Sequence, residues 1–65
     1  MIEKFRFLVY IGTSTRHHTY RVVDTGGRYI LQQRLKYSTW QCASDEFETI
    51  DGLLKSDSFG NLFVN

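Results

Sequence analysis

The sequence predicts an α+β fold: a small antiparallel β-sheet of three to four strands with one helix, from the C-terminal half, packed on one face. Three observations predict it. Apolar and polar side chains alternate near the N-terminus, a Gly-Gly pair separates two β-rich runs, and apolar residues then recur at helical spacing. A chain of 65 residues is long enough for one small domain and too short for two. We therefore expect a single domain over residues 1–65.

Residues 4–11 have the two-residue period of a strand. The odd-numbered side chains of one face are all apolar, and they are Phe5, Phe7, Val9 and Ile11. The opposite face is only half polar, and it holds Lys4, Arg6, Leu8 and Tyr10. That mixture indicates partial cover of the second face by another element or by a partner.

Two β-rich runs, 19–24 and 28–36, flank Gly26 and Gly27 and predict a hairpin. A two-residue hairpin loop needs positive φ at both central positions, which glycine adopts without strain. This turn would place Val22 opposite Leu31, Val23 opposite Ile30 and Arg21 opposite Gln32. The register then sorts the hairpin side chains onto two faces. The apolar face, expected to form the core, holds Tyr20, Val22, Tyr29, Leu31 and Leu35.

The outer face of the hairpin is the candidate binding surface. It is basic around a small apolar centre and holds Arg21, Val23, Arg28, Ile30, Gln32, Arg34 and Lys36. An apolar centre within a charged rim is typical of protein-binding patches. The same arginines would also suit nucleic-acid phosphates, with Gln32 or an arginine reaching a base edge. We expect Arg21, Arg28 and Arg34 to be exposed together.

The remaining elements follow from weaker signals. Residues 37–42, which include Trp40, are β-favouring and predict either a further short strand or an extension of the preceding strand. A helix over 45–55 is expected because Asp45 and Glu48 match a capping box. Its apolar positions at helical spacing are Phe47, Ile50, Leu53 and Leu54. Residues 62–64 would add a short last strand or dock as a tail. The alternative fold is a small barrel-like β structure in which the helix plugs one end.

Candidate catalytic and metal-binding groups are sparse. His17 and His18 are neighbours in a strand-like run, so they point to opposite faces and cannot easily share one ion. Cys42, His18 and Asp24 supply the residue types of a thiol nucleophile, a base and an orienting carboxylate. A lone cysteine beside tryptophan is more typical of a small buried side chain, and we expect Cys42 to be structural or idle. No catalytic residue, metal or cofactor is therefore expected.

Charge is split along the chain. Residues 1–43 carry 7 basic and 2 acidic side chains, or +5, whereas residues 44–65 carry 1 and 5, or −4. We expect a basic sheet beside an acidic helix. The sequence thus favours a non-enzymatic protein-interaction module, such as a small regulator or inhibitor, that occupies an acidic surface of a larger protein. A nucleic-acid-binding module that uses the basic outer face is the alternative.

Location and association follow from composition. The single cysteine and the absence of a long apolar run predict a cytoplasmic protein with no membrane segment. A free sheet edge at Phe5 to Ile11 or Leu62 to Val64 would favour a homodimer. A virus is a natural source for a protein of this length.

Overall fold

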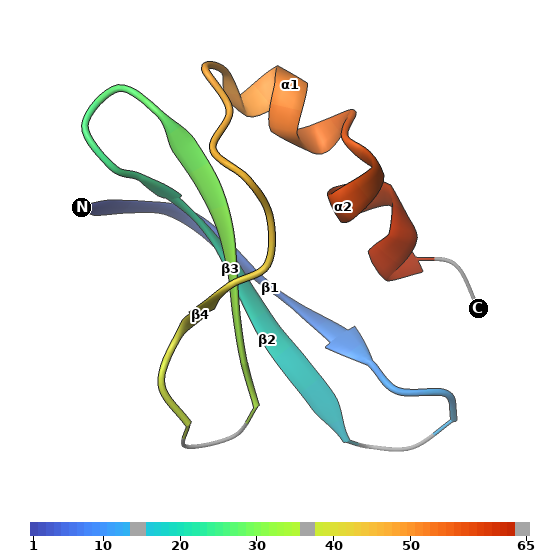
Figure 1. Cartoon of the computed structure of the whole chain (residues 1–65). Coiled ribbons are helices and arrows are strands. Elements are labelled where there is room, and N and C mark those ends of the chain that lie inside the picture. Colours follow the sequence, from blue (N-terminus) through green and yellow to red (C-terminus); the bar gives the residue numbers. More distant parts are fainter. Residues whose placement is uncertain (14–15, 36–37, 64–65) are drawn as a thin grey trace.

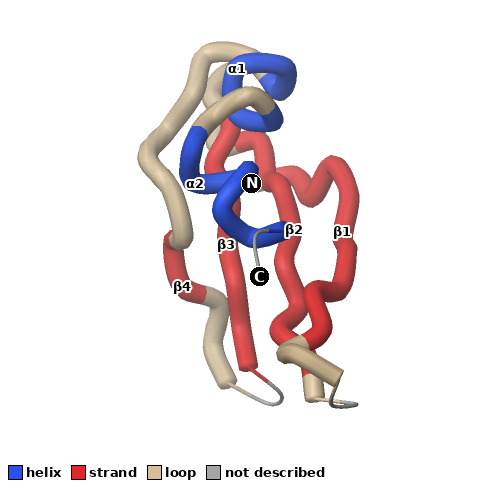
Figure 2. Tube along the Cα trace, turned by 90° about the vertical axis from the view of Figure 1, so that its right-hand side faces the viewer, coloured by secondary structure: helices blue, strands red, loops and turns tan. Residues whose placement is uncertain are grey.

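The computed structural model describes residues 1–13, 16–35 and 38–63 and confirms a small α+β fold (Figure 1). One antiparallel sheet runs in chain order through β1 (Ile2–Tyr10), β2 (His17–Asp24), β3 (Tyr29–Leu35) and β4 (Gln41–Cys42). The helices α1 (Ile50–Leu54) and α2 (Asp57–Gly60) and the 3₁₀ helix η1 (Asn61–Phe63) follow. Figure 2 shows this helical segment in front of β2 and β3, so it covers one face of the sheet.

The hairpin between β2 and β3 has the predicted turn and register. Val22 pairs with Leu31, Val23 with Ile30 and Arg21 with Gln32. The turn closes through a 2.8 Å hydrogen bond from the Thr25 N–H to the Arg28 carbonyl, and Gly26 and Gly27 have φ of 105° and 98°. Asp24 completes the turn, because its Oδ1 accepts hydrogen bonds from the N–H groups of Gly26 (2.9 Å) and Gly27 (2.8 Å).

Replacing a turn glycine should destabilise the fold. Gly27→Val forces a β-branched residue to positive φ, which costs more than about 1 kcal/mol. Gly60→Val is the matched control, because Gly60 does not have positive φ and a Cβ there meets no neighbouring atom. Urea denaturation should show a lower midpoint for Gly27→Val than for the control. Equal midpoints would contradict the strained turn.

The Asp24 carboxylate makes part of the stability depend on pH. Hydrogen bonds from the backbone N–H groups of Gly27 and Gly26 hold the pKa of Asp24 below its ordinary value of 3.8. The ionised form therefore stabilises the folded state above about pH 3.8, and this contribution is lost as pH falls through the folded pKa. We expect the difference in unfolding free energy between wild type and Asp24→Ala to be constant near neutral pH and to shrink in acid. If this difference stays constant as the pH falls to about one unit below the ordinary pKa of Asp24, the carboxylate does not have this role.

The core lies between the sheet and the helical segment. Val22, Leu31 and Leu53 are fully buried and Tyr20 is 5% exposed, which confirms the predicted core face for the hairpin residues described. Tyr29 is half-buried beside them, and the side chain of Leu35 lies outside the described part of the structure. Partly buried side chains complete the cluster, and they are Phe7, Val9, Tyr29, Ala43, Phe47, Phe59 and Leu62.

The helix begins later than predicted. It starts at Ile50 with Thr49 as its N-cap, whose Oγ1 accepts a 2.9 Å hydrogen bond from the Gly52 N–H, so the predicted start at Asp45 is wrong. The chain before it instead pairs with β3. The Phe47 N–H donates to the Tyr29 carbonyl at 2.8 Å, and the Tyr29 N–H donates to the Phe47 carbonyl at 2.7 Å. The Ala43 N–H donates to the Leu31 carbonyl at 2.8 Å. The Phe47 carbonyl, which the predicted helix would have used to accept from the N–H of Asp51, is therefore bonded to Tyr29 instead.

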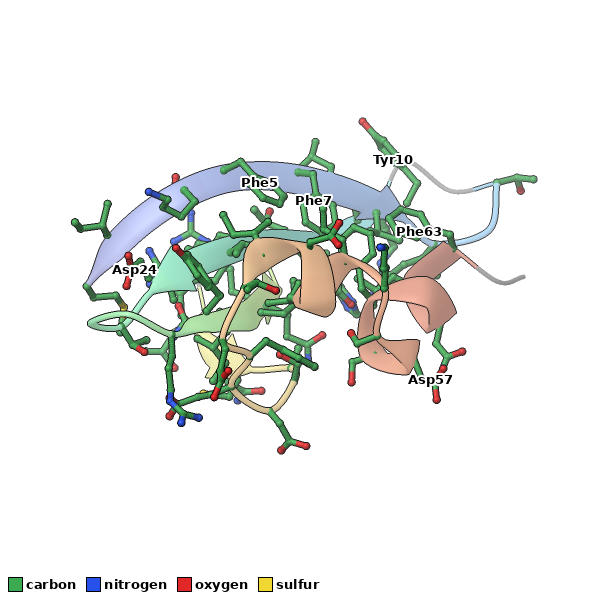
Figure 3. The ribbon with its side chains drawn as sticks, turned by 90° about the horizontal axis from the view of Figure 1, so that it is seen from above. Phe5, Phe7, Tyr10, Asp24, Asp57 and Phe63 are labelled. Atoms are coloured by element: carbon green, nitrogen blue, oxygen red, sulfur yellow. The ribbon has the colours of Figure 1, made fainter. Side chains whose placement is uncertain are left out.

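The end of the described chain is helical. Ser56 is the N-cap of α2, because its hydroxyl accepts a 3.4 Å hydrogen bond from the Phe59 N–H. Of the two alternatives for residues 62–64, the short last strand is wrong for Leu62 and Phe63, which belong to η1. Leu62 packs on the core. The centroid of the Phe63 ring lies 6.2 Å from that of Phe7 and 5.2 Å from that of Phe59 (Figure 3). The docked tail is thus the better description up to Phe63, and Val64 lies outside the described residues.

Candidate functional site: an arginine–tryptophan cluster

Three arginines meet on the sheet face opposite the helices. Arg6 of β1 pairs directly with Arg21 of β2, and Arg34 lies on β3 with the same strand parity as Gln32, the partner of Arg21. The loop before β4 adds Trp40. The guanidinium carbons of Arg21, Arg34 and Arg6 lie 4.2, 4.6 and 5.3 Å from the Trp40 ring centroid. We call Arg6, Arg21, Arg34 and Trp40 the arginine–tryptophan cluster.

Two polar side chains hold the cluster in place. Glu3 Oε1 lies 2.8 Å from Arg6 Nη2 and 3.5 Å from Arg21 Nη1. Gln32 Oε1 accepts a 2.8 Å hydrogen bond from Arg21 Nε. The hydrogen bond from Arg6 lowers the pKa of Glu3, with a smaller contribution from Arg21. Arg21 is therefore fixed on several sides, whereas Arg6 keeps nearly half of its side chain exposed.

The electrostatics of this cluster are unfavourable for the isolated chain. Like charges directly opposite one another on paired strands destabilise a sheet, and Arg6 faces Arg21. Within the described part of the chain, these three positive charges have one carboxylate in ion-pair contact, Glu3, which leaves a surplus of two. Stacking on the Trp40 ring offsets part of the repulsion, by about 0.5–1 kcal/mol for each exposed cation–π contact. The cluster is thus held together while remaining strongly positive.

The predicted apolar centre of this face is not exposed. Val23 is 0%, Gln32 7% and Ile30 9% exposed, so the expectation that Val23 and Ile30 are available to a partner is wrong. Val23 lies between Glu3 and Ile30 in the register. Arg21 and Gln32, which neighbour these residues along β2 and β3, are hydrogen-bonded to each other at 2.8 Å.

Arg28 does not join the other predicted arginines. It is exposed at the hairpin turn, six residues before Arg34 and therefore about 20 Å from it along the strand. Lys36, the other basic residue predicted for the site, lies outside the described residues. Sequence patterns missed Arg6 and Trp40 as site residues. Strand parity put Arg6 on the half-polar face, but only the β1–β2 register shows that it faces Arg21.

The thiol, imidazole and carboxylate do not assemble a catalytic group. His18 and Asp24 are six residues apart on β2, about 20 Å. Cys42 pairs with Gln32, so β3 separates it from β2. The expectation of a buried Cys42 is wrong, since it is exposed on the outermost strand. Within residues 1–13, 16–35 and 38–63, no three His, Cys, Asp or Glu side chains are grouped so that they could hold a metal ion.

Replacing the cysteine should therefore have little effect. Cys42→Ser is an exposed substitution, and we expect it to change the unfolding free energy by about 0.5 kcal/mol or less. Partner binding by the folded variant should also be unchanged. Thermal denaturation and a pull-down with the variant check both. Selective loss of activity in a folded Cys42→Ser protein would indicate a reactive thiol.

A hollow lies mainly on the helix-side face of the sheet, because Gln33 pairs with Tyr20 and with Gln41, and His18 shares the strand parity of Tyr20. Its volume is about 240 Å³, and it is lined by His18, Gln33, Arg34, Ser38 and Gln41. This volume is below the usual range of small-molecule sites, about 300–1,000 Å³. The hollow therefore does not resemble an enclosed ligand pocket, and Arg34 is the one residue that it shares with the arginine–tryptophan cluster.

Comparison with protein-family models, curated proteins and solved structures found no match for this chain. In the described part of the chain, no helix is long and apolar enough to cross a bilayer. Function is therefore inferred from the chemistry of the arginine–tryptophan cluster.

Proposed function

We propose that this chain is a non-enzymatic protein-interaction module that binds an acidic surface of a larger protein through the arginine–tryptophan cluster. One observation supports this above the others: three guanidinium groups are gathered around Trp40, and within the described residues Glu3 is the one carboxylate that forms an ion pair with them. Occupying that surface of the partner would make the chain a small regulator or inhibitor.

The chemistry of binding follows from the guanidinium group. Each has several N–H donors in a planar fork that suits a carboxylate, often in bidentate geometry. Stacking on Trp40 holds the guanidiniums in position before binding, so less side-chain entropy is lost for each hydrogen bond formed. Carboxylates of a partner would relieve the repulsion between Arg6 and Arg21 that Glu3 only partly offsets.

Nucleic acid is the alternative partner, and the Trp40 environment favours it less. Single-strand binders use aromatic rings with a free face on which a base stacks. Here the Trp40 ring already has the guanidiniums of Arg21 and Arg34 within 4.6 Å of its centroid. A base would have to compete with these guanidiniums on any ring face that they cover. A nucleic acid would therefore bind mainly through contacts between its phosphates and the arginines.

Affinity capture from a lysate, with and without nuclease treatment, tests the proposal. The baits are wild type, a cluster variant (Arg6→Gln with Arg34→Gln), and a control (Arg28→Gln with Lys55→Gln) that removes the same two charges elsewhere. Lys55 pairs only with Asp51 in an ion pair that is about three-quarters exposed, so the control should fold normally. We expect wild type and control to retain the same protein and the cluster variant to lose it.

Two results would contradict this function. Capture that disappears with nuclease treatment, together with recovered nucleic acid, would establish the alternative. Equal capture by the cluster variant and the control would show that the arginine–tryptophan cluster is not the binding surface. Circular dichroism of all three baits excludes a trivial loss by unfolding.

A further inference from the structure

β1 leaves one long edge of the sheet open. It is the terminal strand in the order β1-β2-β3-β4, and it stands at the margin of the sheet in Figure 2. Apolar side chains along it are exposed, among them Leu8 (45%), Tyr10 (59%) and Ile11 (45%). Tyr10 projects outward from this margin in Figure 3. Long edges with exposed apolar side chains are rarely left without protection in native proteins, because they invite pairing with another strand.

The first part of this edge is protected and the second is not. A bulge interrupts the β1–β2 register between Glu3 and Phe5. The bulge and the charged Lys4 are features that hinder edge pairing. From Arg6 to Tyr10 the register is regular. The segment available for pairing is therefore 6–11.

The hydrogen-bond alternation shows which groups are free to pair. The Ile11 N–H donates to the Arg16 carbonyl at 3.0 Å, so Ile11 bonds toward β2. Successive residues of an antiparallel strand point their N–H and carbonyl groups to alternate sides. The backbone groups of Arg6, Leu8 and Tyr10 therefore point away from β2, toward the open edge.

We propose that a second copy of this chain pairs with β1 along this edge, antiparallel, about a two-fold axis at Leu8. Leu8 then faces Leu8 of the second copy, and Arg6 faces Tyr10 of the second copy. All three outward-pointing residues form hydrogen-bonded pairs. On the core face, Phe5 meets Ile11 and Phe7 meets Val9, which continues the apolar layer across the interface.

Other registers are less favourable. A two-fold axis at Arg6 would set two guanidiniums directly opposite each other. An axis at Phe7 would bring the bulged Lys4 opposite Tyr10. The axis at Leu8 avoids both, and it places the Arg6 guanidinium beside an aromatic ring. The segment 6–11 is thus complementary to itself in charge, shape and hydrogen bonding.

Pairing would also duplicate the arginine–tryptophan cluster. An antiparallel sheet that continues through a two-fold axis keeps the same face of both copies on the same side. Two clusters would then share one face, so a partner with two acidic sites would be bound with increased avidity. This last step rests on the proposed function, whereas the pairing of β1 does not.

Cysteine cross-linking tests the register in the absence of any partner. Hydrogen-bonded antiparallel pairs have Cα atoms about 5.5 Å apart, within the range that a disulfide spans. In a Cys42→Ser background, Leu8→Cys should form a covalent dimer on oxidation. Leu54→Cys, at an exposed leucine of α1, should not. Arg6→Cys alone should not cross-link, but a mixture of Arg6→Cys and Tyr10→Cys should give the heterodimer.

Sedimentation supplies the second measurement. Wild type should be dimeric at about 100 μM, and Leu8→Lys should be monomeric because two ammonium groups would meet at the axis. Leu54→Lys makes the same substitution in α1, away from the β1 edge, and this variant should stay dimeric. A monomeric wild type, a dimeric Leu8→Lys, or equal cross-linking at Leu8→Cys and Leu54→Cys would overturn the pairing. None of these results depends on partner binding, so the proposed function is tested separately.

Discussion

Leu53→Ala should unfold most of the protein at room temperature. Leu53 is fully buried against Tyr20, Val22 and Leu31, and it is the only fully buried side chain that the described helical segment contributes. Truncating a buried leucine to alanine costs about 2–5 kcal/mol. A domain below about 70–80 residues rarely gains more than about 3–5 kcal/mol from its core, so this loss is comparable to the whole stability.

The matched control is Leu54→Ala. Leu54 is the next residue of α1 and is 38% exposed, so its truncation should cost far less. Thermal and urea denaturation followed by circular dichroism measure both variants. Similar stability of Leu53→Ala and Leu54→Ala would mean that α1 does not hold the sheet face as the structure has it.

Charge reversal in the arginine–tryptophan cluster should abolish partner binding. Arg6→Glu with Arg34→Glu turns three positive charges and one negative into one positive and three negative. Hydrogen bonds to charged groups contribute about 1.5–3 kcal/mol each, so losing two of them weakens binding by at least about a hundredfold. The captured partner, titrated onto immobilised chain, gives this affinity. Replacement of Arg34 and Arg6 should leave the buried core residues in place.

The acidic segment provides the opposing control. Glu46 and Glu48 are exposed before α1, and Glu46→Lys with Glu48→Lys makes a charge change of the same size and opposite sign. We expect this variant to bind the partner with nearly wild-type affinity. If it fails to bind while the arginine variant binds normally, the acidic segment is the recognition surface and the roles of the two faces are inverted.

Local signals were sufficient to predict the hairpin and its core face. Gly26 and Gly27 determine the turn, the turn determines the register, and the two-residue period then places Val22 and Leu31 inside. Each step depends on residues that are near one another in sequence. The alternation in β1 likewise predicted a strand over 4–11, close to the observed Ile2–Tyr10.

Long-range contacts caused the main errors. The Asp45 capping box is a valid local signal, but Phe47 bonds to Tyr29 across the sheet edge, and the helix begins at Ile50 instead. The candidate site changed for the same reason. Arg6 contacts this cluster because β1 pairs with β2 in a register that sets it opposite Arg21. Trp40 reaches Arg21 from a loop, and a periodic sequence pattern does not predict the path of a loop. Val23 is fully buried although strand parity places it on the outer face, and an alternating pattern alone does not predict how much of a side chain stays exposed.

Trp40 is the only tryptophan of the chain, so its fluorescence reports directly on the arginine–tryptophan cluster. The most direct test is a titration of wild type with an oligo-glutamate peptide that contains no tryptophan, at low salt. We expect a saturable change in Trp40 emission that is kept in Arg28→Gln with Lys55→Gln and lost in Arg6→Gln with Arg34→Gln. Unchanged emission in wild type, or the same response in both variants, would contradict the cluster as the binding site for acidic surfaces.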